Sequence, residues 1–508
     1  MSIATNLEKI ETDITNAYSA VSTKGGTIPA NKNTNNLEAA INSIPSGGGS
    51  AVSDDVIFYD YDGTIVDSYS ASDFANLQAM PQNPSHTGLT AQGWNWSLAD
   101  AKTYVANHGK LNIGQMYTTD DEKTRIYIHL EDGRLSPYLG FAVNGSATIE
   151  WGDGTSETVT GTSVDTNVYT QHNYANAGDY IIKLSSSNKI YLRGNSYRSY
   201  LLIKNNNIKN EDWVYLTCIK KVELSSNISI EDSAFGQCHS LASITIPSGI
   251  TTIGTYAFGT CYLLTNITIP SGLTTIGSYA FSNCTLLTNV ILPSGLTTIS
   301  ERAFFSCHSL ASITIPSGLT TIDTYAFGNC SSLTNIILPN SVTTIGTYAF
   351  SSCPSLTNIT IPSEIKEISD SVFSGCYSLT SITLPNGLLR IYSSAFSNCT
   401  SLTNIILPSS VIYIYSSAFY NCYSLTNIKI PSGVKKVESN VFANCYGMSF
   451  YDFTARTSVP TLSYTNAFYN IPSDCKIIVR DNLYDTWVAA TNWSNYASYI
   501  VRESDYNV

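Results

Sequence analysis

The cysteines are the residues of this chain that are most suited, by their number and spacing, to bind metal or form disulfides. Ten of the twelve cysteines follow one another at intervals of 23 residues, from Cys238 to Cys445. A metal array would need closely spaced cysteine or histidine ligands within each repeat, and the repeat lacks them. In a stack of identical units the Cβ vectors of neighbouring cysteines are parallel and do not converge as a disulfide requires. We therefore predict reduced, buried, structural thiols and no bound metal.

The elements that position these thiols follow from the rest of the repeat. In the coil that starts at Cys238, Ile244 and Ile246 alternate with polar residues, which predicts a strand with one buried face. Pro247 ends that strand because it has no N–H to donate, and Ser248-Gly249 turns the chain. A phenylalanine three residues before each cysteine completes the apolar set. One unit of this size cannot bury its apolar face alone, so the period predicts a solenoid.

Residues 216–448 carry this register and resemble the BspA-type leucine-rich repeats of bacterial surface proteins. That resemblance implies a right-handed solenoid used for adhesion. After Cys445 the register decays into residues 449–508, which include a predicted helix, DNLYDTWVAATNW. Solenoid ends need such atypical segments to hide core and unpaired edges, so we predict a C-terminal cap.

The segment VIFYDYDGTIVDS offers another possible chemistry. It resembles the first motif of haloacid-dehalogenase-type phosphatases, and the resemblance implies a nucleophile and an acid/base beside a magnesium ion. Their places would be filled by Asp60, Asp62, Gly63 and Thr64. The series of βαβ units and the later acidic pair that this fold needs are missing from the sequence. We therefore expect residues 56–140 to form a small α+β module with a capped helix from Ser97 to Gly109, without catalysis.

No other set of residues predicts catalysis. The six histidines are scattered and indicate no Ser/His/Asp arrangement: His86, His108, His129, His172, His239 and His308. We predict that the protein is not an enzyme and has no catalytic residues and no cofactor.

A third motif follows, IEWGDGTSETV and then HNYANAGDYIIKL, and it resembles the PKD-type β-sandwich. The matching residues are Trp151, Gly152, Asp153, Gly154, Tyr174, Gly178 and Tyr180. The resemblance implies a spacer or carbohydrate-associated domain over residues 141–190, joined to the solenoid by a connector at 191–215. The tryptophan and the turn glycines have structural explanations.

The N-terminal residues 1–47 predict a helical assembly segment, followed by a Ser/Gly-rich linker at 48–55. Apolar residues with a 4-3-4-3-4 spacing form the seam of a coiled coil: Ile3, Leu7, Ile10, Ile14, Ala17 and Val21. The alternative is one amphipathic helix that packs on its own domain. The seam predicts an oligomer, with a trimer favoured. The segment resembles N-terminal segments of tail-fibre-like proteins in phages of gut Firmicutes, which implies other tail or baseplate proteins as partners.

Composition limits the remaining functions. The net charge is −12, so binding to nucleic acid has no electrostatic support, and no apolar stretch approaches the length of a membrane span. The N-terminus has neither a basic region nor an apolar core of the kind found in secretory signals. This predicts a protein made in a reducing cytoplasm.

Together these features predict a multidomain, mainly β chain: an N-terminal helical oligomerisation segment, a small α+β module, a PKD-like β-sandwich and a C-terminal right-handed solenoid with a cap. The function they favour is a phage tail-fibre or receptor-binding protein of the virion, which contacts a host-surface glycan or protein through the solenoid. The alternative is a BspA-like adhesin of the bacterial cell surface, and the third is a phosphatase.

Variable positions on the repeat are the best candidates for ligand contact, because the core occupies the invariant ones. Tyrosines that recur in columns could stack on sugars or anchor a protein. The candidates are Tyr256, Tyr279, Tyr325, Tyr348, Tyr377, Tyr392, Tyr415 and Tyr423. It is equally open that they only cover the edges of the coils.

Overall fold

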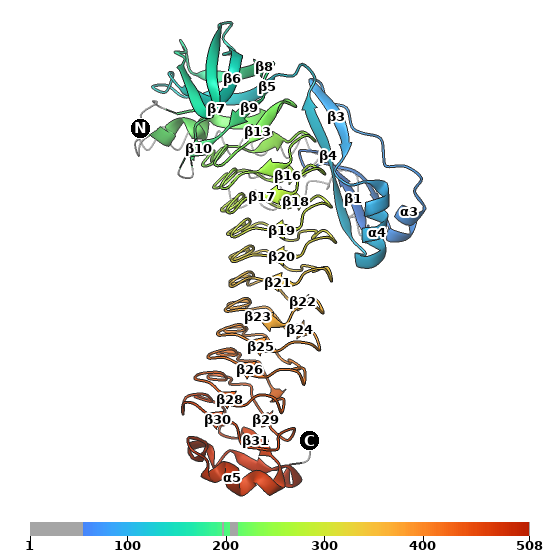
Figure 1. The fold of residues 1–508 in the computed structure, drawn as a ribbon, viewed down its shortest axis with the longest axis vertical. Helices are drawn as coiled ribbons and strands as arrows, with labels where there is room; N and C mark the ends of the chain where they lie inside the picture. Colours follow the sequence, from blue (N-terminus) through green and yellow to red (C-terminus); the bar gives the residue numbers. More distant parts are fainter. Residues whose placement is uncertain (1–53, 196–197, 204–211, 507–508) are drawn as a thin grey trace, which may run out of the picture.

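The computed structural model describes residues 54–195, 198–203 and 212–506. An α+β module and an antiparallel sheet lie at one end of a long stack of coils, and a helical cap closes the other end (Figure 1). The predicted coiled-coil seam and most of the linker after it lie outside the described residues, so the trimer stays a prediction. Among the described residues, no helix combines the length and the apolar character needed to cross a membrane.

The α+β module is a four-stranded sheet with two helices. Its strands are β1 (Val56–Tyr59), β2 (Ile65–Tyr69), β3 (Leu89–Trp94) and β4 (Leu111–Thr119), in the spatial order β2-β1-β4-β3. Its helices are α3 (Ala71–Asn76) and α4 (Leu98–His108). The side chain of Ser97 accepts the backbone N–H of Asp100 at the start of α4, and Gly109 ends the helix with φ +83°. The predicted capped helix is therefore confirmed.

This module has a hydrophobic core of its own. Phe58, Phe74, Trp94, Trp96 and other apolar side chains pack into one cluster, all of it within residues 56–113. The solenoid core is a separate cluster that begins at Ile126.

The next strands close the N-terminal end of the solenoid. They are β5 (Thr124–Leu130), β6 (Tyr138–Glu150), β7 (Ser156–Gln171), β8 (Gly178–Ser186) and β9 (Ile190–Leu192). β5 pairs with β12 (Ile219–Glu223) and β9 pairs with β13 (Ile228–Ile230), which are strands of the first coil. One ten-stranded sheet therefore joins both sides of the solenoid.

This sheet begins earlier in the chain than the PKD-like module predicted over 141–190, because β5 and the start of β6 belong to it. The described strands form one sheet that shares its core with the repeats. The PKD-like sandwich is accordingly not shown. The rest of the connector predicted over 191–215 holds the short strands β10 (Gly194–Asn195) and β11 (Arg198–Ser199) and the beginning of the 3-10 helix η1 (Asp212–Cys218).

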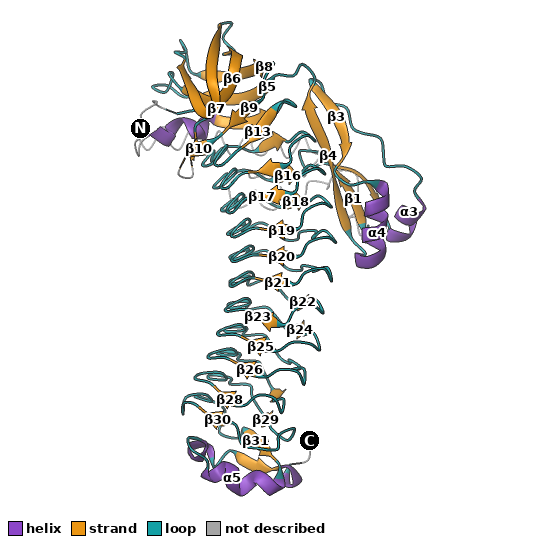
Figure 2. Cartoon of the chain, viewed as in Figure 1, coloured by secondary structure: helices purple, strands orange, loops and turns teal. Residues whose placement is uncertain are grey.

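The coils of the solenoid contribute short parallel strands to two columns (Figure 2), and the coils at 312–314, 335–337 and 404–406 have no strand in the first of them. We call the first the proline-side column, because its strands run toward the repeat proline: β14 (Ser243–Thr245), β16 (Asn266–Thr268), β18 (Asn289–Ile291), β22 (Asn358–Thr360), β24 (Ser381–Thr383) and β27 (Asn427–Lys429). The second column holds the return strands: β15 (Thr252–Ile253), β17 (Thr275–Ile276), β19 (Thr298–Ile299), β20 (Thr321–Ile322), β21 (Thr344–Ile345), β23 (Glu367–Ile368), β25 (Arg390–Ile391), β26 (Tyr413–Ile414) and β28 (Lys436–Val437). Partner residues differ by 23 positions, as Thr298 and Thr321 do, so the repeat sets the register.

The third side of each coil is a run of turns with two left-handed residues, such as Tyr279 (φ 58°) and Asn283 (φ 59°). Asparagine often fills the second of these positions because its short polar side chain tolerates this conformation. The turns bring the phenylalanines into a continuous stack inside the solenoid. Neighbouring ring centroids lie between 5.2 Å apart, for Phe235 and Phe258, and 5.8 Å apart, for Phe350 and Phe373.

None of the twelve cysteines forms a disulfide and all are buried, which agrees with the predicted column of buried thiols. Each thiol from Cys261 to Cys445 also donates to the carbonyl of the phenylalanine 26 residues earlier, at Sγ–O distances between 3.1 and 3.4 Å. Burial raises the pKa of the Cys284 thiol to about 12. The thiols are therefore weak hydrogen-bond donors that link successive coils.

The C-terminal cap closes the stack with aromatic side chains. Strands β29 (Phe450–Asp452), β31 (Lys476–Val479) and β32 (Ile500–Arg502) continue the proline-side column, and β30 (Thr461–Leu462) continues the return column. Trp487 and Trp493 are fully buried against Phe453. The predicted helix is shorter than expected: η2 (Asp481–Leu483), α5 (Tyr484–Ala489) and η3 (Trp493–Tyr496) replace one continuous element, and η4 (Glu503–Asp505) follows β32.

Candidate binding surface

The tyrosines of the turn side form a stacked column. Tyr256 and Tyr279 stack with ring centroids 4.8 Å apart, and Tyr325 and Tyr348 stack at 4.5 Å. In the coil between these pairs Arg302 takes the place of a tyrosine. Its guanidinium carbon lies 5.2 Å from the centroid of the Tyr279 ring and 4.5 Å from that of the Tyr325 ring. All five side chains are half-buried. Most of their faces cover one another, so mainly ring edges and hydroxyl groups are left for a ligand.

The remaining candidate tyrosines lie in two further groups. Tyr392 and Tyr415 stack at 4.9 Å with nearly parallel rings, two positions earlier in the repeat than the first column. Tyr377 and Tyr423, on the corner after the cysteine, are 52% and 41% exposed. The structure therefore does not bring the eight tyrosines into one site. Tyr377 and Tyr423 are the two with substantial free surface.

The α+β module occupies the proline-side column over the first coils, a contact that the sequence did not predict. The Nδ2 of Asn95 donates to the carbonyls of Ile269 and Ile291, at 3.2 and 3.3 Å. The indole Nε1 of Trp96 donates to the carbonyl of Leu292 at 3.0 Å. Asn95 is fully buried, and its Oδ1 accepts the backbone N–H of Gly114 at 2.8 Å. One carboxamide thus connects the module to two coils.

The repeat prolines explain why the carbonyls of Ile269 and Leu292 are available, whereas the carbonyl of Ile291 also accepts the backbone N–H of Ile269 at 3.1 Å. The ladder between β16 and β18 ends at the pair Thr268 and Ile291, and continuing its register by one residue would give the carbonyl of Ile269 the donor of Pro293, which has no N–H. The same argument applies to Leu292, whose expected donor is Pro316. The prolines therefore leave a column of backbone acceptors along the edge of the proline-side column.

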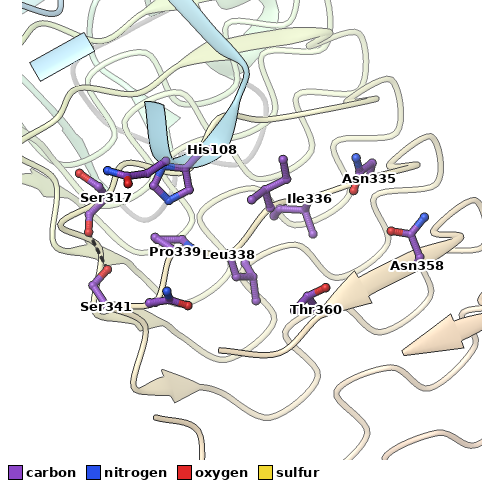
Figure 3. Close-up of a pocket in the computed structure, with 12 residues that line it drawn as sticks. His108, Ser317, Asn335, Ile336, Leu338, Pro339, Ser341, Asn358 and Thr360 are labelled. Carbon is purple, nitrogen blue, oxygen red and sulfur yellow. Dashed lines mark hydrogen bonds between the residues drawn. The ribbon is translucent and has the colours of Figure 1, made fainter. Parts of the chain in front are cut away.

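A cleft opens where the module ends. It has a volume of about 630 Å³ and lies between the end of α4 and the coils below it (Figure 3). His108 and Asn107 line it from the module, and the coils contribute Ser317, Asn335, Leu338, Ser341 and their neighbours. The Oγ of Ser341 donates to the carbonyl of Ser317 at 2.7 Å. The lining is mostly amide and hydroxyl groups, which can bind neutral polar ligands.

Beyond this cleft the proline-side column is open. Ile291, below the module, is 3% exposed, whereas the repeat-equivalent Ile337, which lines the cleft, is 42% exposed and Ile406, beyond it, is 77% exposed. Around them stand outward-facing asparagine and threonine side chains, including Asn404 and Thr383.

The residues of the phosphatase-like motif have structural partners. Asp60 is 6% exposed, and its Oδ2 lies 2.6 Å from the Nε2 of His86. The Oδ1 of Asp62 accepts the backbone N–H of Thr64 at 2.9 Å. The motif forms the turn of an antiparallel hairpin between β1 and β2. Within the described ranges, no group of three or more histidine, cysteine or acidic side chains is placed to hold a metal ion.

The residues of the PKD-like motif likewise support a turn. Trp151 is buried and stacks on His172 at 4.7 Å, and the Nε2 of His172 lies 2.7 Å from the Oδ2 of Asp153. The hydroxyl of Tyr174 donates to the carbonyl of Trp151 at 2.9 Å.

Comparisons with known proteins identify the repeats. A family model described as "BspA type Leucine rich repeat region" matches residues 206–334 and 320–449. Among solved structures, a leucine-rich repeat protein from Bacteroides ovatus is 29% identical, with 50% of this chain and 76% of that chain covered and a TM-score of 0.35. A leucine-rich repeat protein of T. pallidum is 31% identical, with 37% and 85% covered and a TM-score of 0.31. No curated protein matches the chain.

Proposed function

Through residues 206–449 the chain belongs to the BspA-type leucine-rich repeat proteins, and we propose from this premise that it is a bacterial cell-surface adhesin that binds partners through its solenoid. The observation that carries the proposal is that the repeat separates invariant core positions from variable surface positions. The repeated Leu, Ile, Phe and Cys positions are buried in every coil, as at Leu333, Phe327 and Cys330. The variable positions lie outside, so the surface can change without loss of the fold.

The partner we propose is a glycan or protein on the surface of a host cell. The open part of the proline-side column and the exposed Tyr377 and Tyr423 offer amides, hydroxyl groups and aromatic rings to such a partner. A net charge of −12 argues against a polyanionic ligand. Asp60 and Asp62 of the phosphatase-like motif accept hydrogen bonds within their own hairpin, and the thiols of the cysteine column are buried, so these groups support binding better than catalysis.

The alternative, a phage tail fibre, depends on residues 1–50, all of which lie outside the described residues. The trimer, and tail or baseplate proteins as partners, belong to that alternative. We place it second because its support is confined to this segment, whereas the repeats account for most of the described chain.

Location and binding can be tested together in the bacterium that encodes the protein. We expect an antibody against the solenoid to label intact cells, and deletion of the gene to reduce attachment to host cells. Complementation with the wild-type gene controls for effects on neighbouring genes. Recovery of the protein in purified phage particles, with none at the cell surface, would refute the adhesin and support the tail fibre.

A further inference from the structure

The docking site of the α+β module is repeated further along the solenoid. The module contacts the backbone N–H of Ser248, the side chains of Thr268, Asn289 and Ile291, and the carbonyl of Leu292. The same residue types recur two coils later, at Ser294, Thr314, Asn335, Ile337 and Leu338, three of which line the cleft beside the module. They recur again five coils, or 115 residues, after the first set, and we call these residues the second set: Ser363, Thr383, Asn404, Ile406 and Leu407. Asn266, which the module also contacts, is replaced there by Ser381. Thr383 lies in strand β24 as Thr268 lies in β16, whereas residues 404–406 form no strand where the first set has β18. The second set therefore offers the same five residue types on the same side of the solenoid, with a less complete strand ladder.

The two sets differ in exposure. Thr268 and Ile291 are 8% and 3% exposed because β4 lies over them at Gly114. A Cβ atom at Gly114 would come within 2.5 Å of the Thr268 side chain, so the strand needs a glycine to approach this closely. At the second set Thr383 is exposed, and Ile406 is 77% exposed. Ile406 is the most exposed large hydrophobic side chain among the described residues.

The second set also has backbone acceptors without ladder donors. Leu384 and Leu407 are each followed by a proline, and the ladder donors of their carbonyls would be Pro408 and Pro431. At the first set the equivalent carbonyls, of Ile269 and Leu292, accept from Asn95 and Trp96.

We propose that the surface formed by Ser363, Thr383, Asn404, Ile406 and Leu407 is a second docking site for an extended protein segment. That segment carries a glycine where it crosses Thr383 and Ile406, and side-chain N–H donors, carboxamide or indole, that reach the carbonyls of Leu384 and Leu407. The open surface is continuous with the module interface and repeats its chemistry, so the module itself shows what fits. The inference rests on the proposed function only in that the solenoid binds partners.

The module is the probe for this site. Residues 54–119 and the rest of the described chain have separate hydrophobic cores, so each can be produced as a fragment. We expect one free module to bind one full-length chain in isothermal titration, because the chain's own module already fills the first site. Ile406→Asp should weaken this binding at least tenfold. Tyr413→Ala, an exposed residue of the return column, should leave it unchanged.

A solenoid fragment of residues 120–508 controls for the competence of the module, because its first site is empty. If this fragment binds one module and the full-length chain binds none, the second site does not accept this chemistry and the proposal is wrong. If neither binds, the contact needs the covalent connection, which also refutes it. If Ile406→Asp reduces binding to glycans while free module does not bind, the site takes a sugar and not a protein segment.

These outcomes separate this inference from the proposed function. Loss of module binding with normal attachment to host cells would refute only the second docking site. Module binding in a protein that is absent from the cell surface would refute only the adhesin.

Discussion

Removal of one phenylalanine ring from the internal stack should destabilise the solenoid locally and strongly. Phe327 is fully buried, and its ring lies 5.6 Å from the ring of Phe304 and 5.6 Å from that of Phe350. Replacement of a buried phenylalanine by alanine typically costs about 3–5 kcal/mol. Since Phe327→Ala removes two stacking contacts, each worth roughly 0.5–1.5 kcal/mol, we expect a cost at the upper end of that range.

The loss should stay near the altered coil, because each coil of a solenoid contacts only its neighbours. The carbonyl of Phe327 that accepts the Cys353 thiol belongs to the backbone and remains in the variant. We therefore expect urea unfolding to begin at a lower concentration. Hydrogen exchange should be fastest in the coils on either side of residue 327, with the two caps still protected.

The matched control is Phe305→Ala, because Phe305 is a phenylalanine of the same coil region that does not belong to the internal stack. Phe305 is half-buried and makes an edge contact with Tyr325, with ring centroids 5.8 Å apart. It should cost about 1 kcal/mol, within the usual range for a partly buried side chain. Equal destabilisation by the two variants, or a change below about 1 kcal/mol for Phe327→Ala, would show that the internal stack does not hold the coils together.

Four further outcomes are expected. Thiol titration of unreduced protein should find no fast-reacting cysteine in the folded state and all twelve after denaturation, because none forms a disulfide and all are buried; thiols missing in pairs would contradict this. Burial raises the pKa of the Cys330 thiol from its ordinary value of 9.0 to about 12. The unfolded chain therefore releases these protons first, and stability should fall as pH rises above about 9; a urea midpoint that is constant between pH 8 and 10 would refute the reasoning. Asn95→Ala should cost roughly 1–3 kcal/mol in module docking, seen as faster hydrogen exchange at Ile269 and Leu292 without change in the distant coils. Ile10→Lys should dissociate the predicted trimer in light scattering while the solenoid stays folded; a wild-type monomer would refute the seam.

The sequence predicted the solenoid well because its information is repeated. One misread residue does not matter when ten cysteines, their phenylalanines and nine prolines share a phase. The alternation at Ile244 and Ile246 predicted the strand of the first column, and Pro247 predicted its end. The free thiols were predicted from parallel Cβ vectors, although their hydrogen bonds to phenylalanine carbonyls were not. Those bonds depend on the turn conformation, which the left-handed residues set and the apolar pattern does not reveal.

The N-terminal parts were harder to predict because each motif occurs once. The Asp60 motif has the residues of a phosphatase turn, yet the strand after it returns as an antiparallel hairpin. The Trp151 motif does form a turn, but its strands join the sheet of the first coil instead of showing a separate sandwich. Pairing between β5 and β12 joins residues nearly a hundred positions apart, and no local pattern specifies such a partner.

The tyrosine columns and the module interface show that the sequence also could not predict which repeated surfaces remain available for binding. The spacing of 23 residues correctly placed Tyr325 and Tyr348 next to each other, but it could not show that their faces would be used up by stacking. The most exposed apolar residue, Ile406, was not a candidate, although it occupies the outward position of the repeat strand that is polar in most coils, as at Thr245. Its exposure follows from a three-dimensional fact: the module reaches Ile291 and does not reach Ile406. In a solenoid, therefore, a candidate site is recognised where one copy of a repeated surface is covered and another is left open.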